Sequence, residues 1–257
     1  MSSQLKDKVE EVIDIALSVA KKNWDMSGNI FESISMDGLN VGIENDSRTI
    51  IRKSLNDFIG TDFIGSKDRE LICISADLRN STDRIKTTLN YLGKYDNKFQ
   101  RAFYITSALL PSLEVVISHY GGFVTEYLGD GVLGFFDAEK DKHSSICNSG
   151  CAARFIVDEM SKILQNKMKE YYEKETISIG VGLAISPTLL SKVGTYTEST
   201  IKAFGPCVYD ASKRNHGYNE VLVEPSLEAQ WPRSKNPGTG ISFKRVSHLN
   251  MDSFKMC

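Results

Sequence analysis

The sequence lacks the features that mark secreted, membrane-spanning or nucleic-acid-coating proteins. Its opening residues, MSSQLKDKVEE, hold no apolar signal core, so we expect no secretion signal. Its best candidate for a membrane span, AFYITSALLPSLEVVIS, contains a proline, a glutamate and several hydroxyl groups, and we judge it too polar to cross a bilayer. The net charge of -2 argues against a protein that coats nucleic acid or an anionic membrane. We therefore expect a cytoplasmic protein with neither nucleic acid nor a membrane as partner.

The five cysteines are odd in number and irregularly spaced, which suits a reducing cytoplasm rather than a disulfide framework. Cys147 and Cys151 can share a helix face with His143, as the ligands of a metal would. Two thiols on a helix that holds no metal are the interpretation we favour.

The N-terminal part of the chain is predicted to be a helical extension over residues 1–65. Residues 4–24 have the apolar spacing of an amphipathic helix, at Leu5, Val9, Val12, Ala16 and Val19. This helix can form a short coiled-coil seam between two copies, or it can pack onto the chain's own domain. Residues 25–45 resemble a connection in composition, and residues 47–60 are predicted to form another short helix.

A main domain is predicted over residues 66–257, and a 41% hydrophobic content is enough to give it a sizeable core. ELICISA is a predicted strand, and a long helical stretch follows to about residue 118, with a break near Gly93. Further strands and helices are expected in the order GGFVTEYL, VLGFF, helix 144–169, TISIGVGLAIS, TIKAFGP, helix 208–215, NEVLVE and GISFKRV. The order β-α-β-β-α-β predicts an α/β (α+β) fold of the ferredoxin-like kind.

Two aspartates occupy special places in this pattern. Asp77 ends the first strand, and Asp130 lies between Gly129 and Gly131 at the tip of the hairpin. The two strands can be neighbours, so the two carboxylates can converge at one edge of the sheet. Paired carboxylates with few other ligands suit Mg²⁺ or Mn²⁺ carrying substrate phosphates. The helix start at residues 80–82 (Asn80, Ser81 and Thr82) would aim free backbone N–H groups at the same place, which favours a polyphosphate.

Each aspartate also has a purely structural interpretation. An Asp-Gly turn is a common hairpin tip without a function, and an aspartate at a strand end is often a helix cap. Either feature alone we would call structural. Together, with the strand–helix junction between them, they favour a metal site.

Four segments of the main domain resemble the class III nucleotidyl cyclases, the family of adenylate and guanylate cyclases. SADLRNST resembles the family's first strand, and GGFVTEYLGDGVLGFF resembles its hairpin. ISIGVGLAIS and FGPCVYDASK resemble two later family segments, in the right order. The resemblance covers about residues 70–250, and it implies a cyclase homology domain. A diguanylate cyclase is disfavoured, because its metal carboxylates directly follow the Gly-Gly pair.

The resemblance implies roles for individual residues. Asp77 and Asp130 match the metal-binding aspartates, and Leu78 matches a residue whose backbone carbonyl helps to hold a metal. Two ions, Mg²⁺ or Mn²⁺, would activate the ribose 3′-hydroxyl and bind the triphosphate of a nucleoside triphosphate. The 3′-oxygen attacks the α-phosphorus and pyrophosphate leaves, which makes the enzyme a phosphorus-oxygen lyase. The family's active sites lie between two such domains, so the resemblance implies a homodimer with two equivalent sites at the interface.

At the positions that read the base and stabilise the transition state, the chain departs from the family. Glu126 and Lys202 fall at the two base-reading positions, and this pair matches neither purine code. Tyr209 falls at the transition-state asparagine, and Lys213 falls at the arginine. Lysine keeps the positive charge but loses the bidentate fork of arginine.

Tyrosine is larger than asparagine, so Tyr209 would crowd the pocket. A smaller pocket with a new donor–acceptor pair suggests a pyrimidine base, and these departures resemble the bacterial antiphage cyclases that make cyclic UMP or cyclic CMP. Glu126 and Lys202 are each compatible with UTP and with CTP. In this interpretation the product acts on a separate cyclic-nucleotide-responsive effector. A guanylate (or adenylate) cyclase is the first alternative, and a non-catalytic nucleotide-sensing domain is the second.

Other basic residues are candidates for phosphate contacts, and surface lysines or arginines without a function are the alternative interpretation. Near the helix start these candidates are Arg79 and Arg84, and in the last predicted strand they are Lys244 and Arg245.

Overall fold

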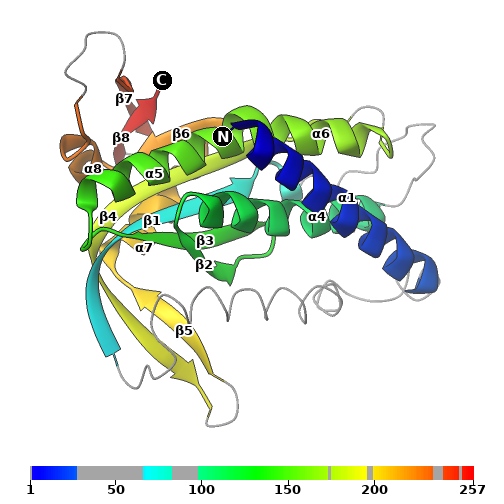
Figure 1. The fold of residues 1–257 in the computed structure, drawn as a ribbon, viewed down its shortest axis with the longest axis horizontal. Helices are drawn as coiled ribbons and strands as arrows, with labels where there is room; N and C mark the ends of the chain where they lie inside the picture. Colours follow the sequence, from blue (N-terminus) through cyan, green and yellow to red (C-terminus); the bar gives the residue numbers. More distant parts are fainter. Residues whose placement is uncertain are drawn as a thin grey trace.

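The computed structural model describes residues 2–27, 66–82, 98–172, 175–195, 199–233, 240–248 and 251–257 (Figure 1). The predicted connection over 25–45, apart from its first three residues, lies outside these ranges. So do the predicted helix over 47–60, the break near Gly93, and Arg84.

One mixed sheet forms the centre of the molecule. Its strands are β1 (Ser66–Leu78), β2 (Phe123–Tyr127), β3 (Gly131–Asp137), β4 (Ile179–Gly194), β5 (Ser199–Phe204), β6 (Glu220–Val223), β7 (Phe243–His248) and β8 (Met251–Met256). The sheet order is β2-β3-β1-β4-β6-β8-β7, with β5 paired to β4. The first four of these strands are antiparallel neighbours, as in a ferredoxin-like βαββαβ unit. The predicted α+β fold class is therefore confirmed.

Helices cover both faces of the sheet. They are α1 (Ser2–Ser27), α4 (Lys98–His119), α5 (Lys142–Phe155), the π-helical turn η2 (Ile156–Met160), α6 (Ser161–Lys169), α7 (Pro206–Arg214) and α8 (Pro225–Ala229). Ile72 and Ile74 of β1 join the core beneath α1, α4, α5 and α6. Leu71 and Cys73 join a second core with α7. Side chains alternate across a strand, so β1 is apolar on both faces, which explains the unbroken run ELICISA.

Helix α1 packs along the chain's own domain, against α4 and α6, rather than standing free (Figure 1). Its buried side chains are Leu5, Val9, Ile13, Leu17, Ala20 and Trp24. The predicted stripe was wrong at its C-terminal end, because Val19 is 50% exposed. Lys167 of α6 fastens the helix by binding Glu10 at 3.1 Å and Asp14 at 2.8 Å. The sequence left open a coiled-coil seam between two copies or packing onto the chain's own domain, and the structure shows the packing.

Helix α4 is the buried helix of the first core. Among the described helices it alone is long and apolar enough to span a bilayer by length and composition, over Phe99–His119, and 67% of that stretch is buried inside the protein. Its apolar character is therefore explained by its contacts with α1 and the sheet.

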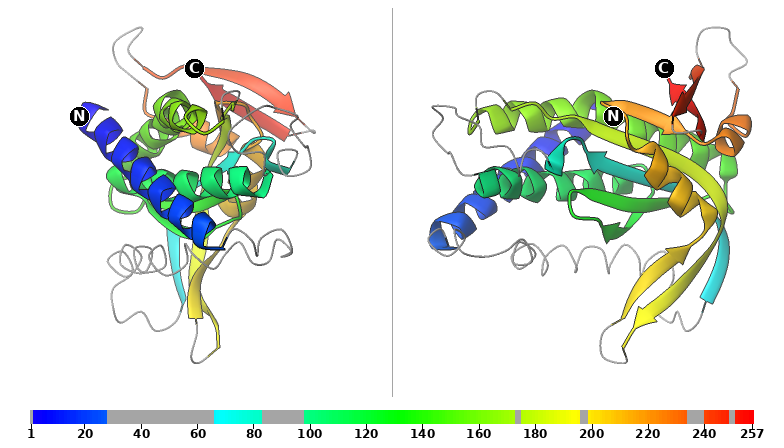
Figure 2. Two further views of the ribbon diagram at one scale, coloured as in Figure 1. Left: turned by 90° about the vertical axis from the view of Figure 1, so that its right-hand side faces the viewer. Right: turned by 180° about the vertical axis from the view of Figure 1, so that it is seen from behind.

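The start of β1, the end of β4 and the paired strand β5 form an arm that extends away from the helical layer (Figure 2). Two elements of the C-terminal part were not predicted from the sequence. They are the short helix α8 and the strand β8, which pairs with β6 and β7. The predicted helix over 144–169 is present as α5 and α6, joined by η2.

Candidate active site

Asp77 and Asp130 lie at the same edge of the sheet, as the sequence predicted. Asp77 is opposite Gly131 in the β1–β3 ladder. The backbone N–H of Leu78 donates to the carbonyl of Asp130 at 3.2 Å, and the N–H of Leu128 donates to the carbonyl of Gly131 at 2.8 Å. These bonds fix the tip of the hairpin against the end of β1.

Glycines make this close approach possible. A Cβ at Gly131 would lie 2.5 Å from the carbonyl oxygen of Ala76 and 2.9 Å from Oδ1 of Asp77. Gly129 has a φ of +70°, which side chains on L-residues rarely adopt. The sequence Gly-Asp-Gly therefore does two things, because it turns the chain and brings the backbone against the first carboxylate.

The electrostatics of the pair favour a bound cation. Burial first, and the Asp130 carboxylate second, raise the pKa of Asp77 to about 6, while Arg79 acts in the opposite direction. Oδ2 of Asp130 is buried and has no hydrogen-bond partner among the described residues. An unpartnered buried carboxylate oxygen costs free energy unless a cation or donor reaches it.

These residues fit a hard divalent cation. Asp77 and Asp130 supply carboxylate oxygens, which Mg²⁺ and Mn²⁺ prefer. The side chain of Leu78 is apolar and buried in the core, so only its backbone carbonyl could bind a metal. No group of three or more His, Cys, Asp or Glu side chains suited to a metal occurs within the described ranges, and this covers the His143, Cys147 and Cys151 set. A pair of carboxylates leaves coordination positions for phosphate oxygens.

The turn after β1 contains Arg79, which contacts the carboxylate pair, and Asn80. Nη1 of Arg79 donates to Oδ2 of Asp77 at 3.0 Å and to the carbonyl of Asn215 at 3.3 Å. The guanidinium also lies 5.7 Å from the ring centre of Tyr218, whose hydroxyl donates to Oδ1 of Asn80 at 2.8 Å. Asn80 has a φ of 59°. Residues 81 and 82 begin a helical turn directly after it, as predicted for Ser81 and Thr82.

Glu126 and Lys202 come together as a pair. Nζ of Lys202, on β5, lies 2.5 Å from Oε2 of Glu126, on β2. The side chains are 38% and 18% exposed, so the pair is accessible from one side. Opposite charges thus meet at the two positions that the resemblance assigns to base reading.

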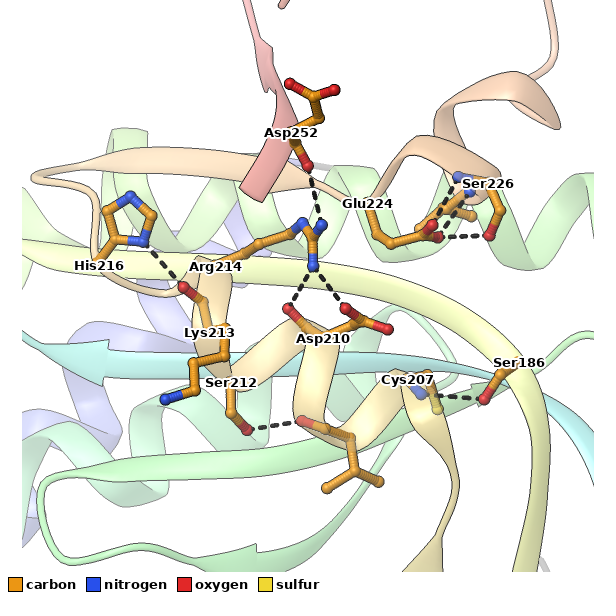
Figure 3. Close-up of polar contacts among 12 residues, drawn as sticks. Ser186, Cys207, Asp210, Ser212, Lys213, Arg214, His216, Glu224, Ser226 and Asp252 are labelled. Carbon is orange, nitrogen blue, oxygen red and sulfur yellow. Dashed lines mark hydrogen bonds and ion pairs between the residues drawn. The ribbon is translucent and has the colours of Figure 1, made fainter. Parts of the chain in front are cut away.

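Tyr209 and Lys213 lie one helical turn apart on the outer face of α7. Tyr209 is 63% exposed, and the ammonium of Lys213 lies 5.5 Å from the centre of its ring. Arg214 points into the protein instead, where it donates to Oδ1 of Asp210 at 2.9 Å and to the carbonyl of Asp252 at 2.9 Å (Figure 3). Arg214 is therefore a structural residue, and Lys213 is the cation that α7 presents to its surroundings.

Two glycines in β4 set the position of α7. A Cβ at Gly180 would lie 1.9 Å from the carbonyl oxygen of Asn215, and a Cβ at Gly182 would lie 2.0 Å from that of Ala211. Nδ2 of Asn215 also donates to Oγ of Ser75 at 3.0 Å. Sequence reasoning singled out the segment ISIGVGLAIS but missed why it contains glycine, and it gave no signal for Asn215 or Tyr218.

Lys244 does not lie near Asp77 in the same chain. It lies on the edge strand β7, and β8, β6 and β4 separate that strand from β1 in the sheet. Lys244 is exposed and pairs in register with Lys255. The neighbouring Arg245 binds Asp252 at 2.5 Å on the same hairpin.

No protein-family model and no curated protein sequence matches the chain. Solved structures do match. A guanylyl cyclase, Cya2, has a TM-score of 0.58 at 16% identity, over 75% of this chain and 94% of its own. The adenylyl cyclase CyaB from P. aeruginosa has a TM-score of 0.60 at 13% identity, over 76% and 96%.

A third structure is the guanylate cyclase domain of RhGC from Catenaria anguillulae, which was solved in complex with GTP. It has a TM-score of 0.58 at 16% identity, over 74% of this chain and 98% of its own. At identities this low, these matches establish the fold alone, and all three structures share that fold. The chain has the fold of the class III adenylyl and guanylyl cyclase domains.

Proposed function

We propose that this chain is a nucleotidyl cyclase that converts UTP or CTP into the 3′,5′-cyclic monophosphate and pyrophosphate. The observation that carries the proposal is the carboxylate pair at the end of β1, with its buried Asp130 oxygen that no described donor satisfies. The cyclase fold supports it. So does the sequence resemblance, in which Asp77 and Asp130 match the metal-binding aspartates. In this proposal the enzyme signals in bacterial antiphage defence, and its cyclic product acts on a separate effector.

The metal-binding role falls to three groups of the chain. The carboxylates of Asp77 and Asp130 and the carbonyl of Leu78 would hold two Mg²⁺ or Mn²⁺ ions. When bound, these ions supply Lewis acidity at the 3′-oxygen and charge neutralisation at the triphosphate. The helical turn that begins at Ser81 and Thr82 offers backbone N–H groups to the same phosphates.

The base-reading role falls to Glu126 and Lys202. The carboxylate can accept from N3–H of uracil or from the amino group of cytosine, and the ammonium can donate to a pyrimidine carbonyl or to N3 of cytosine. Their 2.5 Å contact already orients the acceptor beside the donor. A charge-assisted pair of this kind rejects a base that leaves either group unpaired.

The transition-state role falls to Lys213, with Tyr209 as its support. Lys213 is exposed on α7, and the Tyr209 ring holds its ammonium by a cation–π contact. The carboxylate of α7, Asp210, binds Arg214 at 2.9 Å. The exposed Lys213 therefore suits a negatively charged group on another molecule. A homodimer would bring α7 of one protomer, and with it Lys244, to the carboxylate pair of its partner.

Product analysis tests the proposal. The purified chain is incubated with ATP, GTP, CTP or UTP separately, with Mn²⁺, and the products are identified by mass. Cyclic UMP or cyclic CMP is the expected product. Cyclic GMP or cyclic AMP alone would contradict the pyrimidine assignment. Guanylate cyclase is the first alternative, because in the resemblance guanylate cyclases usually have glutamate at the position of Glu126. No product from any nucleotide would favour the sensor, the alternative to which the replacements at Tyr209 and Lys213 point.

A matched pair of variants tests the base-reading role separately from the fold. Glu126→Gln should alter the ratio of kcat/KM between nucleotides and leave Mn²⁺ binding unchanged. The control is Glu220→Gln, because Glu220 and Lys255 form an ion pair of the same length, 2.5 Å, on β6 and β8. If the Glu126 and Glu220 variants shift nucleotide preference equally, Glu126 does not read the base.

A further inference from the structure

We propose that Arg79 is an internal counter-cation of the carboxylate pair. Arg79 competes with the divalent cation for Asp77, and when the cation binds, Arg79 releases Asp77 and donates to a substrate phosphate. This inference rests on the proposed metal role of Asp77 and Asp130. Arg79 directly follows Leu78, whose carbonyl is a proposed metal ligand, and its guanidinium contacts the carboxylate of Asp77. It would therefore link the affinity for the metal to the presence of a polyphosphate.

The contact between Arg79 and Asp77 is placed where a metal would have to bind. Nη1 of Arg79 lies 3.0 Å from Oδ2 of Asp77. A carboxylate oxygen that accepts a guanidinium N–H has less negative charge available for a second cation. With one guanidinium for two carboxylates, the site keeps a net negative charge and can still attract a divalent ion.

The geometry of the contact makes it displaceable. Arg79 uses a single nitrogen for both Asp77 and the Asn215 carbonyl, and its Nε is buried with no acceptor among the described residues. A guanidinium bound for stability alone commonly makes two parallel bonds to a carboxylate. The side chains of Arg79 and Asp77 are 22% and 28% exposed, so an ion can reach them.

Arg79 would stay near the site after it releases Asp77. The face of Tyr218 lies against the guanidinium, and the hydroxyl of Tyr218 is fixed by its bond to Asn80. The carbonyl of Asn215 is a second anchor that does not depend on Asp77. Held in this way, the unused Nε–H and the Nη groups can donate to a phosphate oxygen beside the metal.

The test measures Mn²⁺ binding rather than turnover. Mn²⁺ is titrated into the full chain, and free Mn²⁺ is followed by electron paramagnetic resonance, with no nucleotide added. Arg79→Met should bind Mn²⁺ about fivefold more tightly than the wild type, the change expected on losing one partly exposed charge contact. Arg79→Lys, which keeps the competing charge, should stay close to the wild type.

The same titration in the presence of inorganic tripolyphosphate tests the second half of the inference. Tripolyphosphate should increase the Mn²⁺ affinity of the wild type more than that of Arg79→Met, because only the wild type has the guanidinium to donate. Equal gains in the two proteins would overturn the link between metal and phosphate. Equal or weaker Mn²⁺ affinity of Arg79→Met without tripolyphosphate would overturn the competition.

Controls separate this inference from the proposed function. Asp130→Ala should lose Mn²⁺ binding; if it does and Arg79→Met binds no more tightly than the wild type, only the role of Arg79 is wrong. If Asp130→Ala binds Mn²⁺ normally, or if neither the wild type nor Arg79→Met binds it, the metal site is wrong and both proposals fail. Arg79→Gln, which can still donate to the Asn215 carbonyl, repeats the comparison should Arg79→Met unfold.

Discussion

Each end of the β1–β3 ladder has an arginine beside an aspartate, but the carboxylates are fully hydrogen-bonded at one end and only partly at the other. At one end Asp137 is fully partnered, because Arg69 binds its Oδ2 at 2.6 Å and the N–H of Glu139 donates to its Oδ1 at 3.0 Å. At the other end Asp77 and Asp130 face each other with one partial counter-charge, and an oxygen of Asp130 has no described partner.

We interpret the Asp137 end as structural and the Asp77–Asp130 end as the one that our proposal assigns to a ligand. Two strands that can pair Asp137 with an arginine could pair Asp130 in the same way, yet the hairpin tip places glycine on both sides of it. Natural proteins accept an electrostatic cost of this kind where binding or catalysis needs it. We therefore expect substitutions at the two ends to have opposite consequences.

The largest expected effect is on turnover. Asp130→Ala should lower kcat/KM at least about a thousandfold, because one of the two carboxylates proposed to hold the metal is removed. Asp137→Ala is the matched control on the same hairpin and should change kcat/KM by less than about tenfold. Steady-state kinetics and circular dichroism of both variants check this, and an Asp130→Ala protein with wild-type turnover would refute the metal role.

The same contrast recurs on α7, where Lys213 is exposed and Arg214 is bonded inside the protein. Lys213→Met should lower kcat about ten- to a hundredfold with little loss of stability, while Lys213→Arg should stay within about tenfold. The exposed Lys192 on β4 provides the control, since Lys192→Met should leave kcat unchanged. Indistinguishable kcat values for the two methionine variants would make Lys213 an ordinary surface lysine.

A smaller effect, of opposite sign at the two ends, is expected on the free energy of unfolding. Asp137→Asn should lower it by about 1–3 kcal/mol, because the mostly buried Arg69 loses a charged partner. Asp130→Asn should raise it by up to about 1 kcal/mol, because the repulsion with Asp77 is removed. Urea unfolding at pH 7 with a chelator present measures both, and two changes of the same sign would contradict the comparison.

A further effect is expected on the pH dependence of stability. The pKa of Asp77 is raised from 3.8 to about 6, so the folded state holds the proton more tightly than the unfolded state. This contribution is complete below about pH 4 and is lost as the pH rises through about 6. With a chelator present, unfolding free energy should therefore fall between these values in the wild type. Asp77→Asn should abolish that part of the fall, and an unchanged profile would contradict the assignment.

Local patterns of the sequence carried most of the fold prediction. Apolar, β-prone runs located β1, β3 and β4, and Gly129-Asp130-Gly131 located the hairpin tip. The stripe of α1 was predicted incorrectly because the helix has two apolar faces. Val12, Ile15 and Val19 lie on one face, and α4 covers the other. Only the tertiary partner decides between such faces.

The site was predictable where it depends on strand ends and was not predictable where it depends on long-range contacts. The meeting of Asp77 and Asp130 follows from two adjacent strands. The partners of Arg79 do not, because Asn215 is 136 residues away and contributes a backbone carbonyl, which has no sequence signature. Strand β8 was missed because its six residues, MDSFKM, are short and half polar.

The most direct test of the central claim is a competition among the four nucleotides in one tube. Equal concentrations of ATP, GTP, CTP and UTP are incubated with the purified chain and Mn²⁺, and the cyclic products are quantified by mass. Our account predicts that cyclic UMP or cyclic CMP dominates and that Asp130→Ala forms none. Predominance of cyclic GMP or cyclic AMP would contradict it.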